Sequence, residues 1–280
     1  MKRFSLTILI LAISFLNCES KSQNISVMTY NIRLDVASDG ENAWPNRKDF
    51  LISQILFLSP DIIGIQEARP NQMTDLKNAL KGYKTIGNGR DGDDMGEHSA
   101  IFYNAKRVKV EHDSTFWLSP TPNKVSKGWD AAYPRICTYG LFTLLESHQK
   151  IWVFNTHLDH VGTEAKLEGV KLILEKINDV NTDGFPVVFM GDFNAEPNSN
   201  LIKNLKQKMD DSKDMAKITF GSKGTFNGFK FEEPVIKRID YIMVSKSNVE
   251  IEKYGALSSS VDLKYPSDHF PVLTELKLKE

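Results

Sequence analysis

Cysteine is scarce in this sequence, and no spacing typical of a zinc site is present. The 280 residues include only Cys18 and Cys137, with no CxxC pair and no HExxH motif, which argues against the usual zinc sites. Cys18 lies in an N-terminal leader and is expected to be lipidated or removed, which leaves Cys137 without a partner. We therefore expect no internal disulfide, and we expect Cys137 to pack as a small apolar side chain in a strand.

Basic runs, repeats, low-complexity segments and Pro/Ser-rich linkers are also lacking. Lysine and arginine total 35 against 36 aspartate and glutamate, and the formal net charge is −1. This balance is not that of a dedicated nucleic-acid-binding protein, although a nuclease can carry its positive charge as bound metal. Because nothing divides the chain after the leader, we expect one domain over residues 24–280.

Long hydrophobic runs are absent except at the N-terminus. Lys2 and Arg3 precede a mostly apolar run of thirteen residues, 4–16, which is short for a membrane span and typical of a signal peptide. We predict a signal peptide over residues 1–20 and export to the cell envelope (periplasm or outer membrane) or secretion. Cys18 follows the run where lipoprotein processing would make it a lipidated first residue and a membrane anchor. The residues before it are larger than is usual there, so cleavage without lipidation is the alternative.

The hydrophobic pattern after the leader predicts an α/β protein. Apolar faces, with Pro45 as a start signal and Gly82 as a stop signal, predict helices at 44–58, 70–82 and 163–181. Short apolar or β-branched runs predict strands at 24–32, 61–67, 98–104, 107–112, 135–147, 150–157, 185–194, 238–245 and 270–278. Helices near the start and many strands later favour two packed sheets with helices outside.

Polar side chains recur where the predicted strands begin or end. Ligand-binding and catalytic groups often collect at strand ends. Taken singly, each has a structural explanation such as a turn or a helix cap, but six such stretches together favour a single site. The residues are Asn31, Glu67, His157, Asp192 with Asn194, Asp240, and the pair Asp268-His269.

These residue types suit one reaction in particular. Carboxylates with amide oxygens are ligands for a hard divalent cation such as Mg²⁺ or Mn²⁺. A histidine with a carboxylate partner can orient or deprotonate a water molecule. A second histidine and an arginine can stabilise charge on a phosphoryl group. The set therefore predicts metal-assisted hydrolysis of a phosphate ester.

Seven short motifs together resemble one enzyme superfamily. They are TYNIR, IIGIQE, GEHSAIFY, NTHLDH, GDFNAEP, RIDYI and SDHFPV, spread over residues 29–272. In this order they resemble the endonuclease/exonuclease/phosphatase superfamily, which includes DNase I. The resemblance implies a four-layer α/β sandwich of two mixed β-sheets flanked by helices. WPNRKD, WDAAYPRI and TFNGF further resemble a subgroup of exported bacterial metal-dependent hydrolases.

The resemblance implies a metal site and a water-positioning pair. Glu67 matches the principal metal ligand, helped by Asn31 and Asp268. Asp192 and Asn194 match the pair that positions the attacking water and a phosphate oxygen. The implied cofactor is Mg²⁺ or Mn²⁺.

The resemblance also implies the remaining catalytic and phosphate-binding groups. His269 matches the catalytic histidine, oriented by Asp240 from another strand. His157 matches a second, phosphate-contacting histidine, with Glu97 as its expected partner. Arg135 stands where such enzymes place a phosphate-binding side chain.

Three further residues are candidate substrate contacts. His98 and His160 lie beside motif positions, and Asn227 lies in TFNGF. A plain turn at Asn227-Gly228 explains the last motif nearly as well.

Three functions remain open at this point. The favoured one is a phosphodiesterase or phosphatase acting on a small or lipid-derived ester, because the mature charge is acidic. A secreted DNase or RNase is the alternative, although the basic groove it needs is not evident. A non-catalytic binding module is the least favoured, since no expected site residue is missing. We expect a monomer, and the substrate stays open among nucleic acid, phospholipid, inositol phosphate and sugar phosphate.

The leader generates a direct prediction. We expect the mature protein to begin at a lipid-modified Cys18, and mass spectrometry of its N-terminal peptide checks this. An unmodified peptide that begins after Cys18 would refute lipidation.

Overall fold

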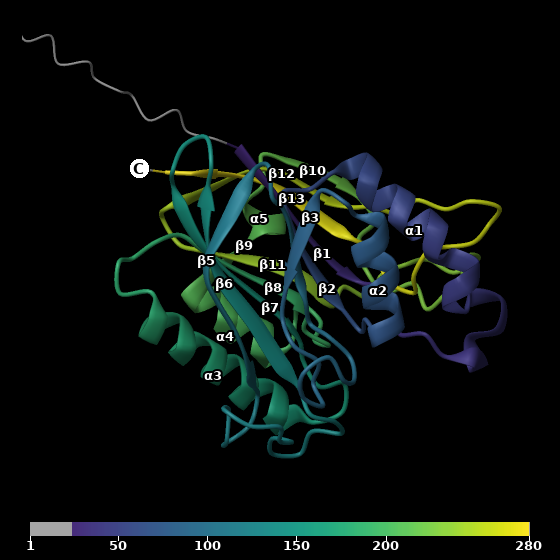
Figure 1. Ribbon diagram of the computed structural model, residues 1–280, viewed down its shortest axis with the longest axis horizontal. Coiled ribbons are helices and arrows are strands. Elements are labelled where there is room, and N and C mark those ends of the chain that lie inside the picture. The colour runs from purple at the N-terminus through teal and green to yellow at the C-terminus, as the bar shows by residue number, and fades with distance from the viewer. Residues whose placement is uncertain (1–23, 280) are drawn as a thin grey trace, which may run out of the picture.

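The computed structural model describes residues 24–279, so the predicted signal peptide and Cys18 lie outside the described residues. Two β-sheets with helices on their outer faces make up this part of the chain (Figure 1). The strands are β1 (Asn24–Asn31), β2 (Ile62–Gln66), β3 (Tyr83–Ile86), β4 (Ile101–Asn104), β5 (Val108–Trp117), β6 (Ile136–Leu144), β7 (Lys150–His157), β8 (Val187–Asp192), β9 (Met209–Asp211), β10 (Ile218–Gly221), β11 (Asp240–Ser245), β12 (Val249–Ala256) and β13 (Val272–Leu278). The helices are the 3₁₀ helix η1 (Ala37–Asn42) and α1 (Trp44–Leu58), α2 (Pro70–Ala79), α3 (Thr163–Val180), α4 (Asn200–Lys208) and α5 (Ser212–Met215).

Both sheets are mixed. The first sheet has seven strands in the order β10-β12-β13-β1-β2-β4-β3, and the second has six in the order β5-β6-β7-β8-β11-β9. In the first, β1 runs parallel to β2 and antiparallel to β13. In the second, β7 runs parallel to β8, and β11 runs antiparallel to β8. The predicted fold class, two mixed sheets flanked by helices, is confirmed.

The alternation of side chains along a strand explains the layers. In β1, Ile25 and Val27 belong to the apolar cluster between the sheets, whereas Met28 and Tyr30 belong to the cluster under α1 and α2. Successive strand residues point to opposite faces, so a strand that is buried on both sides is apolar at nearly every position. The near-continuous apolar runs in the sequence reflect this double burial.

Helices cover the outer face of each sheet. The helices α1 and α2 pack on the first sheet, and α3 and α4 pack on the second, so the four lie on opposite sides of the molecule (Figure 1). Each buried aliphatic side chain contributes about 1.5 to 3 kcal/mol. No helix within residues 24–279 is long and apolar enough to span a bilayer. The main anchoring side chains are Leu51, Ile55, Met73 and Leu76 on the first sheet and Ile173, Ile177, Leu201 and Leu205 on the second.

A buried polar junction ties the two sheets together behind their polar ends. Gln66 Nε2 donates to Thr29 Oγ1 at 3.0 Å within the first sheet and to Asn155 Oδ1 at 2.6 Å across the gap. The Nδ2 of Asn155, which lies on β7, donates in the opposite direction to the carbonyl oxygens of Ile65 at 3.0 Å and Ala100 at 2.9 Å. Leaving such groups unpaired in a core costs about 1 to 3 kcal/mol each, so the network favours one relative placement of the sheets.

The predicted helices and strands are all present, with four strands missed. Cys137 is buried in β6, as expected. The missed strands are short or irregular: β10 is exposed along its length, and β12 carries a bulge between Ile251 and Lys253. A bulge shifts the side-chain alternation by one position, which hides the pattern that identifies a strand. The missed strands are β3, β9, β10 and β12.

Gly191 holds β8 tightly against β7, and its replacement tests that packing. A Cβ atom there would lie 1.9 Å from the carbonyl oxygen of Thr156, and the residue has a φ of +143°. We expect Gly191→Ala to lower the free energy of unfolding by about 3 kcal/mol or more, measured by urea denaturation, because one strand must shift.

Gly184→Ala is the matched control for this substitution. Gly184 also has a positive φ, +70°, but no atom within 4 Å of the added Cβ. It should show only the cost of a left-handed alanine, about 1 to 2 kcal/mol. Equal losses for the two variants would contradict the close-packing account.

Candidate active site

Strand direction brings the polar strand ends to one edge of both sheets. The parallel strands β1 and β2 end at Asn31 and Gln66, and the parallel strands β7 and β8 end at His157 and Asp192. The antiparallel strand β11 begins at Asp240, directly opposite Asp192. A cavity of about 490 Å³ opens at this edge. Of the sequence-predicted site residues, those that line it are Glu67, Glu97, Arg135, His157, His160, Asp192, Asn194, Asp268 and His269.

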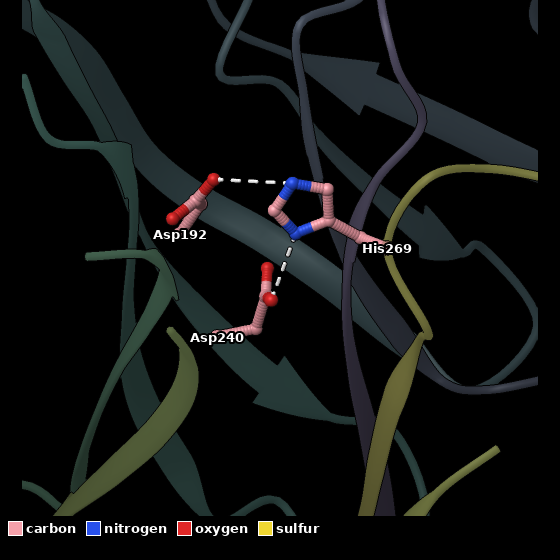
Figure 2. Close-up of side chains that lie close together, drawn as sticks. All are labelled: Asp192, Asp240 and His269. Carbon is pink, nitrogen blue, oxygen red and sulfur yellow. Dashed lines mark hydrogen bonds and ion pairs between the residues drawn. The ribbon is translucent and has the colours of Figure 1, made fainter. Parts of the chain in front are cut away.

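The ring of His269 lies between two buried aspartates (Figure 2). Its Nδ1 is 2.9 Å from Asp240 Oδ2, and its Nε2 is 3.7 Å from Asp192 Oδ2. Asp192 and Asp240 are each 1% exposed, and His269 is 3% exposed. Asp240 is fixed in turn, because Thr225 Oγ1 accepts from its backbone N–H at 3.2 Å. The expected pairing of His269 with an acid from another strand is what the geometry provides.

The electrostatics give His269 and Asp192 different protonation behaviour. Burial alone would lower the pKa of His269, but the charges of Asp240 and Asp192 outweigh it and raise the pKa to about 10. Burial, with the charge of Asp240 adding to it, raises the pKa of Asp192 to about 7. At neutral pH the ring is therefore an imidazolium, while Asp192 is poised between its two protonation states.

Asn31 joins the acids of the two sheets. Its Nδ2 donates to Glu67 Oε1 at 2.9 Å and to Asp192 Oδ2 at 3.0 Å, while its Oδ1 accepts from the backbone N–H of Arg33 at 3.0 Å. Glu67 Oε2 accepts from the backbone N–H of Leu34 at 2.9 Å. The expected role of Asn31 as a metal ligand stays a prediction, since its amide oxygen accepts one hydrogen bond and keeps a second lone pair, while its nitrogen faces the carboxylates. In this structure the Asn31 side chain positions both acids.

Three residues around the site have left-handed backbone conformations. Arg33, Glu67 and Asn194 have φ angles of 55°, 65° and 47°. For non-glycine residues this conformation costs on the order of 1 to 3 kcal/mol each, and it concentrates at functional sites. At Glu67 the turn occurs one residue past β2, where the carboxylate leaves the strand and reaches the cavity.

Asp268 is held by the loop that contains TFNGF. The backbone N–H groups of Asn227 and Gly228 donate to its carbonyl oxygen at 2.8 and 3.0 Å. Its carboxyl is 7% exposed, and burial raises its pKa, with the charge of Glu67 adding to the increase. The Asn227 side chain bonds the Ser267 carbonyl oxygen at 3.0 Å and does not line the cavity. The turn explanation accounts for the contacts of Asn227, and its contact with substrate stays a prediction that this cavity does not support.

His157 and Asn194 form a neutral hydrogen-bonded pair. Asn194 Nδ2 lies 3.0 Å from His157 Nε2 and donates to the carbonyl oxygen of Leu158 at 3.0 Å. Burial lowers the pKa of His157 well below its usual value, and the positive charges of Arg135 and His269 lower it further. His157 is consequently a neutral imidazole that accepts at Nε2.

Two expected substrate contacts have other partners. Glu97 pairs with Arg90 at 2.8 Å, and His157 Nδ1 has no hydrogen-bond partner among residues 24–279, so the expected Glu97–His157 pair is not formed. His98 is buried, with its Nδ1 3.1 Å from the carbonyl oxygen of Ala68, and it borders a small side pocket instead of the main cavity. Glu97 is held by a partner within its own loop, and His98 is held by the backbone just after β2.

Arg135 belongs to a rigid wall of the cavity. Its Nε donates to Asp159 Oδ2 at 3.2 Å, and its Nη2 donates to His160 Nδ1 at 3.1 Å. The His160 ring stacks on Tyr133, with centroids 6.1 Å apart and planes at 17°. Arg90 Cζ lies 4.8 Å from the centroid of the same tyrosine ring. The wall is preorganised, because each cation already has partners.

The comparisons with known proteins agree with this geometry. The model of the Endonuclease/Exonuclease/phosphatase family matches residues 28–269. The chain belongs to this family. Family membership identifies it as a hydrolase that acts on phosphate esters.

Individual relatives extend the comparison. The structure of the mannosyl-6-phosphatase Bt3783 of Bacteroides thetaiotaomicron VPI-5482 is 37% identical, covers 90% of this chain and 99% of that chain, and superposes with a TM-score of 0.86. A second family member from Bacteroides thetaiotaomicron is 36% identical over 93% of this chain and 100% of that chain, with a TM-score of 0.88. Protein L388 of Acanthamoeba polyphaga mimivirus is 29% identical over 161 residues, or 55% of this chain. The chain spans 60% of the length of that curated relative.

Sequence reasoning missed six charged or aromatic residues that line the cavity of this family member. Among them, Arg69 and Lys237 have no ion-pair partner within residues 24–279, whereas Arg33 pairs with Asp39 at 2.9 Å. Arg33 and Arg69 are the two that the sequence could have indicated, because Arg33 ends the motif TYNIR and Arg69 lies two positions after the motif IIGIQE. The others come from separate loops whose meeting place depends on the fold. The missed residues are Arg33, Arg69, Arg90, Tyr133, Phe226 and Lys237.

Two groups of side chains in the site could hold a metal ion. Asp192, Asp240 and His269 bring three ligand atoms within 4.8 Å of one another. Glu67 and Asp268 form a second, all-oxygen group that lines the cavity, and burial raises the pKa of Asp268, with the charge of Glu67 adding to the increase. Divalent metal binding fits both groups by donor chemistry.

The neutral state of His157 predicts a loss of stability in acid. The unfolded chain protonates this histidine near pH 6.5, whereas the folded protein holds its pKa well below that value. Protonation therefore favours unfolding, so stability from this group is full above about pH 6.5 and falls below it. The loss is up to about 1.4 kcal/mol per pH unit.

The measurement is urea denaturation at about pH 7 and about pH 5, with His157→Gln as the comparison. The glutamine keeps an acceptor for Asn194 but does not titrate. Its stability should fall less between the two pH values than that of the unaltered protein. Equal falls would show that His157 is not held neutral.

Proposed function

We propose that this protein is a divalent-metal-dependent phosphoesterase whose substrates are small phosphorylated molecules, sugar phosphates first among them. The observation that carries the proposal is the buried Asp192–His269–Asp240 arrangement at the base of a cavity with five lining cations. Asp192 and His269 themselves line this cavity, so both reach the space where a phosphate ester would bind.

The roles of the two central groups follow from their proton affinities. Asp192, with a pKa of about 7, suits a general base that accepts a proton from the attacking water at neutral pH. His269 stays protonated, with a pKa of about 10, so it suits a charged donor to a phosphoryl oxygen. Asp240 holds the ring by Nδ1 and leaves Nε2–H directed toward the reacting side. A histidine with a carboxylate partner can also deprotonate a water molecule, but this assignment gives that role to Asp192.

Glu67 and Asp268 are the proposed metal ligands. Mg²⁺ and Mn²⁺ prefer oxygen donors and need only one or two carboxylates, with water completing the shell. In the group of Asp192, Asp240 and His269, Nδ1 of the histidine already pairs with Asp240 Oδ2, and Asp240 does not line the cavity. When bound, the ion supplies positive charge beside the phosphate.

Two observations support sugar phosphates as the substrate class: the similarity to a known phosphatase and the positions of the cations around the cavity. The similar structure from Bacteroides thetaiotaomicron is a mannosyl-6-phosphatase, 37% identical over 90% of this chain. The five cations converge on one cavity of about 490 Å³ instead of lining an extended groove. A nuclease needs repeated phosphate contacts along a strand, so nucleic acid is the less supported substrate. Unpaired Arg69 and Lys237 are the cations best placed to meet the substrate phosphate.

A pair of conservative substitutions tests the assignment. Glu67→Gln should weaken Mn²⁺ binding at least about tenfold and lower kcat, because it removes a ligand charge. Asp240→Asn should lower kcat by about 100-fold or more at saturating Mn²⁺, because the histidine loses its orienting partner. It should leave the Mn²⁺ dissociation constant within about twofold of the unaltered value, since Asp240 is not a proposed ligand.

The measurements are isothermal titration with Mn²⁺ and hydrolysis of mannose 6-phosphate and of an aryl phosphate after chelation and metal readdition. Loss of Mn²⁺ binding in Asp240→Asn but not in Glu67→Gln would overturn the metal assignment. Full activity in the presence of a chelator would overturn metal dependence.

A further inference from the structure

A second cavity of about 480 Å³ adjoins the catalytic cavity. The two share Asn194, Lys237 and Ile239, so the boundary between them lies beside the candidate catalytic residues. The remaining wall comes from the first turns of α3, the loop after β8, and the start of α4. Of the candidate residues considered in the sequence, only Asn194 lines this second cavity.

Lys237 marks the boundary between the cavities. Its Nζ lies 5.1 Å from the centroid of the Phe226 ring, and that ring packs edge-on against His269 with centroids 5.1 Å apart. An ammonium group held against an aromatic face keeps a defined position and still has donors to offer. A ligand that touches Lys237 from the second cavity is thus close to the reacting phosphate.

The lining of the second cavity combines unpaired charges with an apolar floor. Lys166, Glu196 and Lys237 have no ion-pair partner within residues 24–279, and all three line the cavity. Ala195 and Ile239 are buried beneath them. Donors and acceptors of both signs are therefore presented above apolar surface.

This chemistry selects among ligand classes. An acyl chain would remove the water from unpaired charges without replacing its hydrogen bonds, which is costly. A nucleobase binds by stacking on aromatic side chains, and no aromatic residue lines this cavity. A chain of sugar units suits it, because hydroxyl groups both donate and accept and the C–H faces of the rings are apolar.

We propose that the second cavity is a subsite for a glycan, and that the enzyme prefers a phosphate carried on an oligosaccharide over the same phosphate on a single sugar. The inference rests on the proposed function and narrows its substrate. Each cavity alone is large enough for a small ligand, so a monosaccharide phosphate in the catalytic cavity leaves the second one unfilled. Further sugar units, attached beyond the phosphorylated one, pass Lys237 and contact Lys166 and Glu196.

The test compares kcat/KM for mannose 6-phosphate and for a mannose trisaccharide that carries the same 6-phosphate. The trisaccharide is expected to be the better substrate by about tenfold or more, as one or two added charged hydrogen bonds would provide. Lys166→Ala removes a donor, and Leu167→Trp places a large side chain in the cavity that Leu167 lines. Each should reduce the trisaccharide-to-monosaccharide ratio toward one.

Leu145→Trp is the matched control. Leu145 is also an exposed leucine, 42% against 40% for Leu167, but it lies just after β6, at the strand end away from the site. This variant should keep the preference for the trisaccharide.

Different outcomes would refute the glycan subsite and the proposed sugar phosphatase activity. Hydrolysis of both sugars with equal kcat/KM, unaffected by Leu167→Trp, would refute the subsite and leave the sugar phosphatase intact. Hydrolysis of an aryl phosphate but of neither sugar would refute the substrate class and the subsite with it. A preference for a dinucleotide or a phospholipid over both sugars would refute the glycan proposal in favour of that class.

Discussion

The crowding of buried carboxylates at one edge of the two sheets is the constraint on which the site depends. Asp192 and Asp240 face each other across neighbouring strands, and both are nearly inaccessible to solvent. Two such charges are tolerated only with positive charge between them, which the His269 ring supplies. Glu67 and Asp268 also line the cavity, and burial raises the pKa of Asp268, with the charge of Glu67 adding to the increase. The catalytic groups and the proposed metal ligands are therefore parts of one cluster of acids at this edge of the sheets.

The scaffold maintains this crowding through packing that lies behind the site. Parallel pairing of β1 with β2 and of β7 with β8 delivers the strand ends to one edge. The Gln66–Asn155 hydrogen bond joins the sheets just behind that edge, and Gly191 lets β8 approach β7 closely enough to place Asp192. Asn31 then bridges Glu67 to Asp192 directly. Charge repulsion would separate the acids if the two sheets could slide past each other. The packing between the sheets prevents this and so keeps the acids in place.

The site residues near strand ends could be predicted from the sequence, whereas the positions of the side chains in loops could not. The acids and His269 were predictable because Asp192 and Asp240 are terminal strand residues, and Glu67, Asp268 and His269 lie within a few residues of a buried strand. Apolar patterning makes a polar residue conspicuous there. Asn227 and His98 were misplaced because their neighbours in sequence do not reveal whether a side chain faces a cavity or its own loop. Lys237 went unnoticed because its place beside the catalytic cavity depends on a long loop folding back. The bulged strand β12 was missed because its alternation is interrupted.

The central claim is that carboxylate oxygens hold the metal ion, while His269 stays protonated and does not bind it. Its most direct test is a crystal structure of the protein soaked with Mn²⁺, with the ion located by its anomalous scattering. The account predicts one strong peak in contact with the carboxylates of Glu67 and Asp268, while His269 keeps its hydrogen bond to Asp240. A peak within bonding distance of a His269 nitrogen and the carboxylates of Asp192 and Asp240 would contradict it.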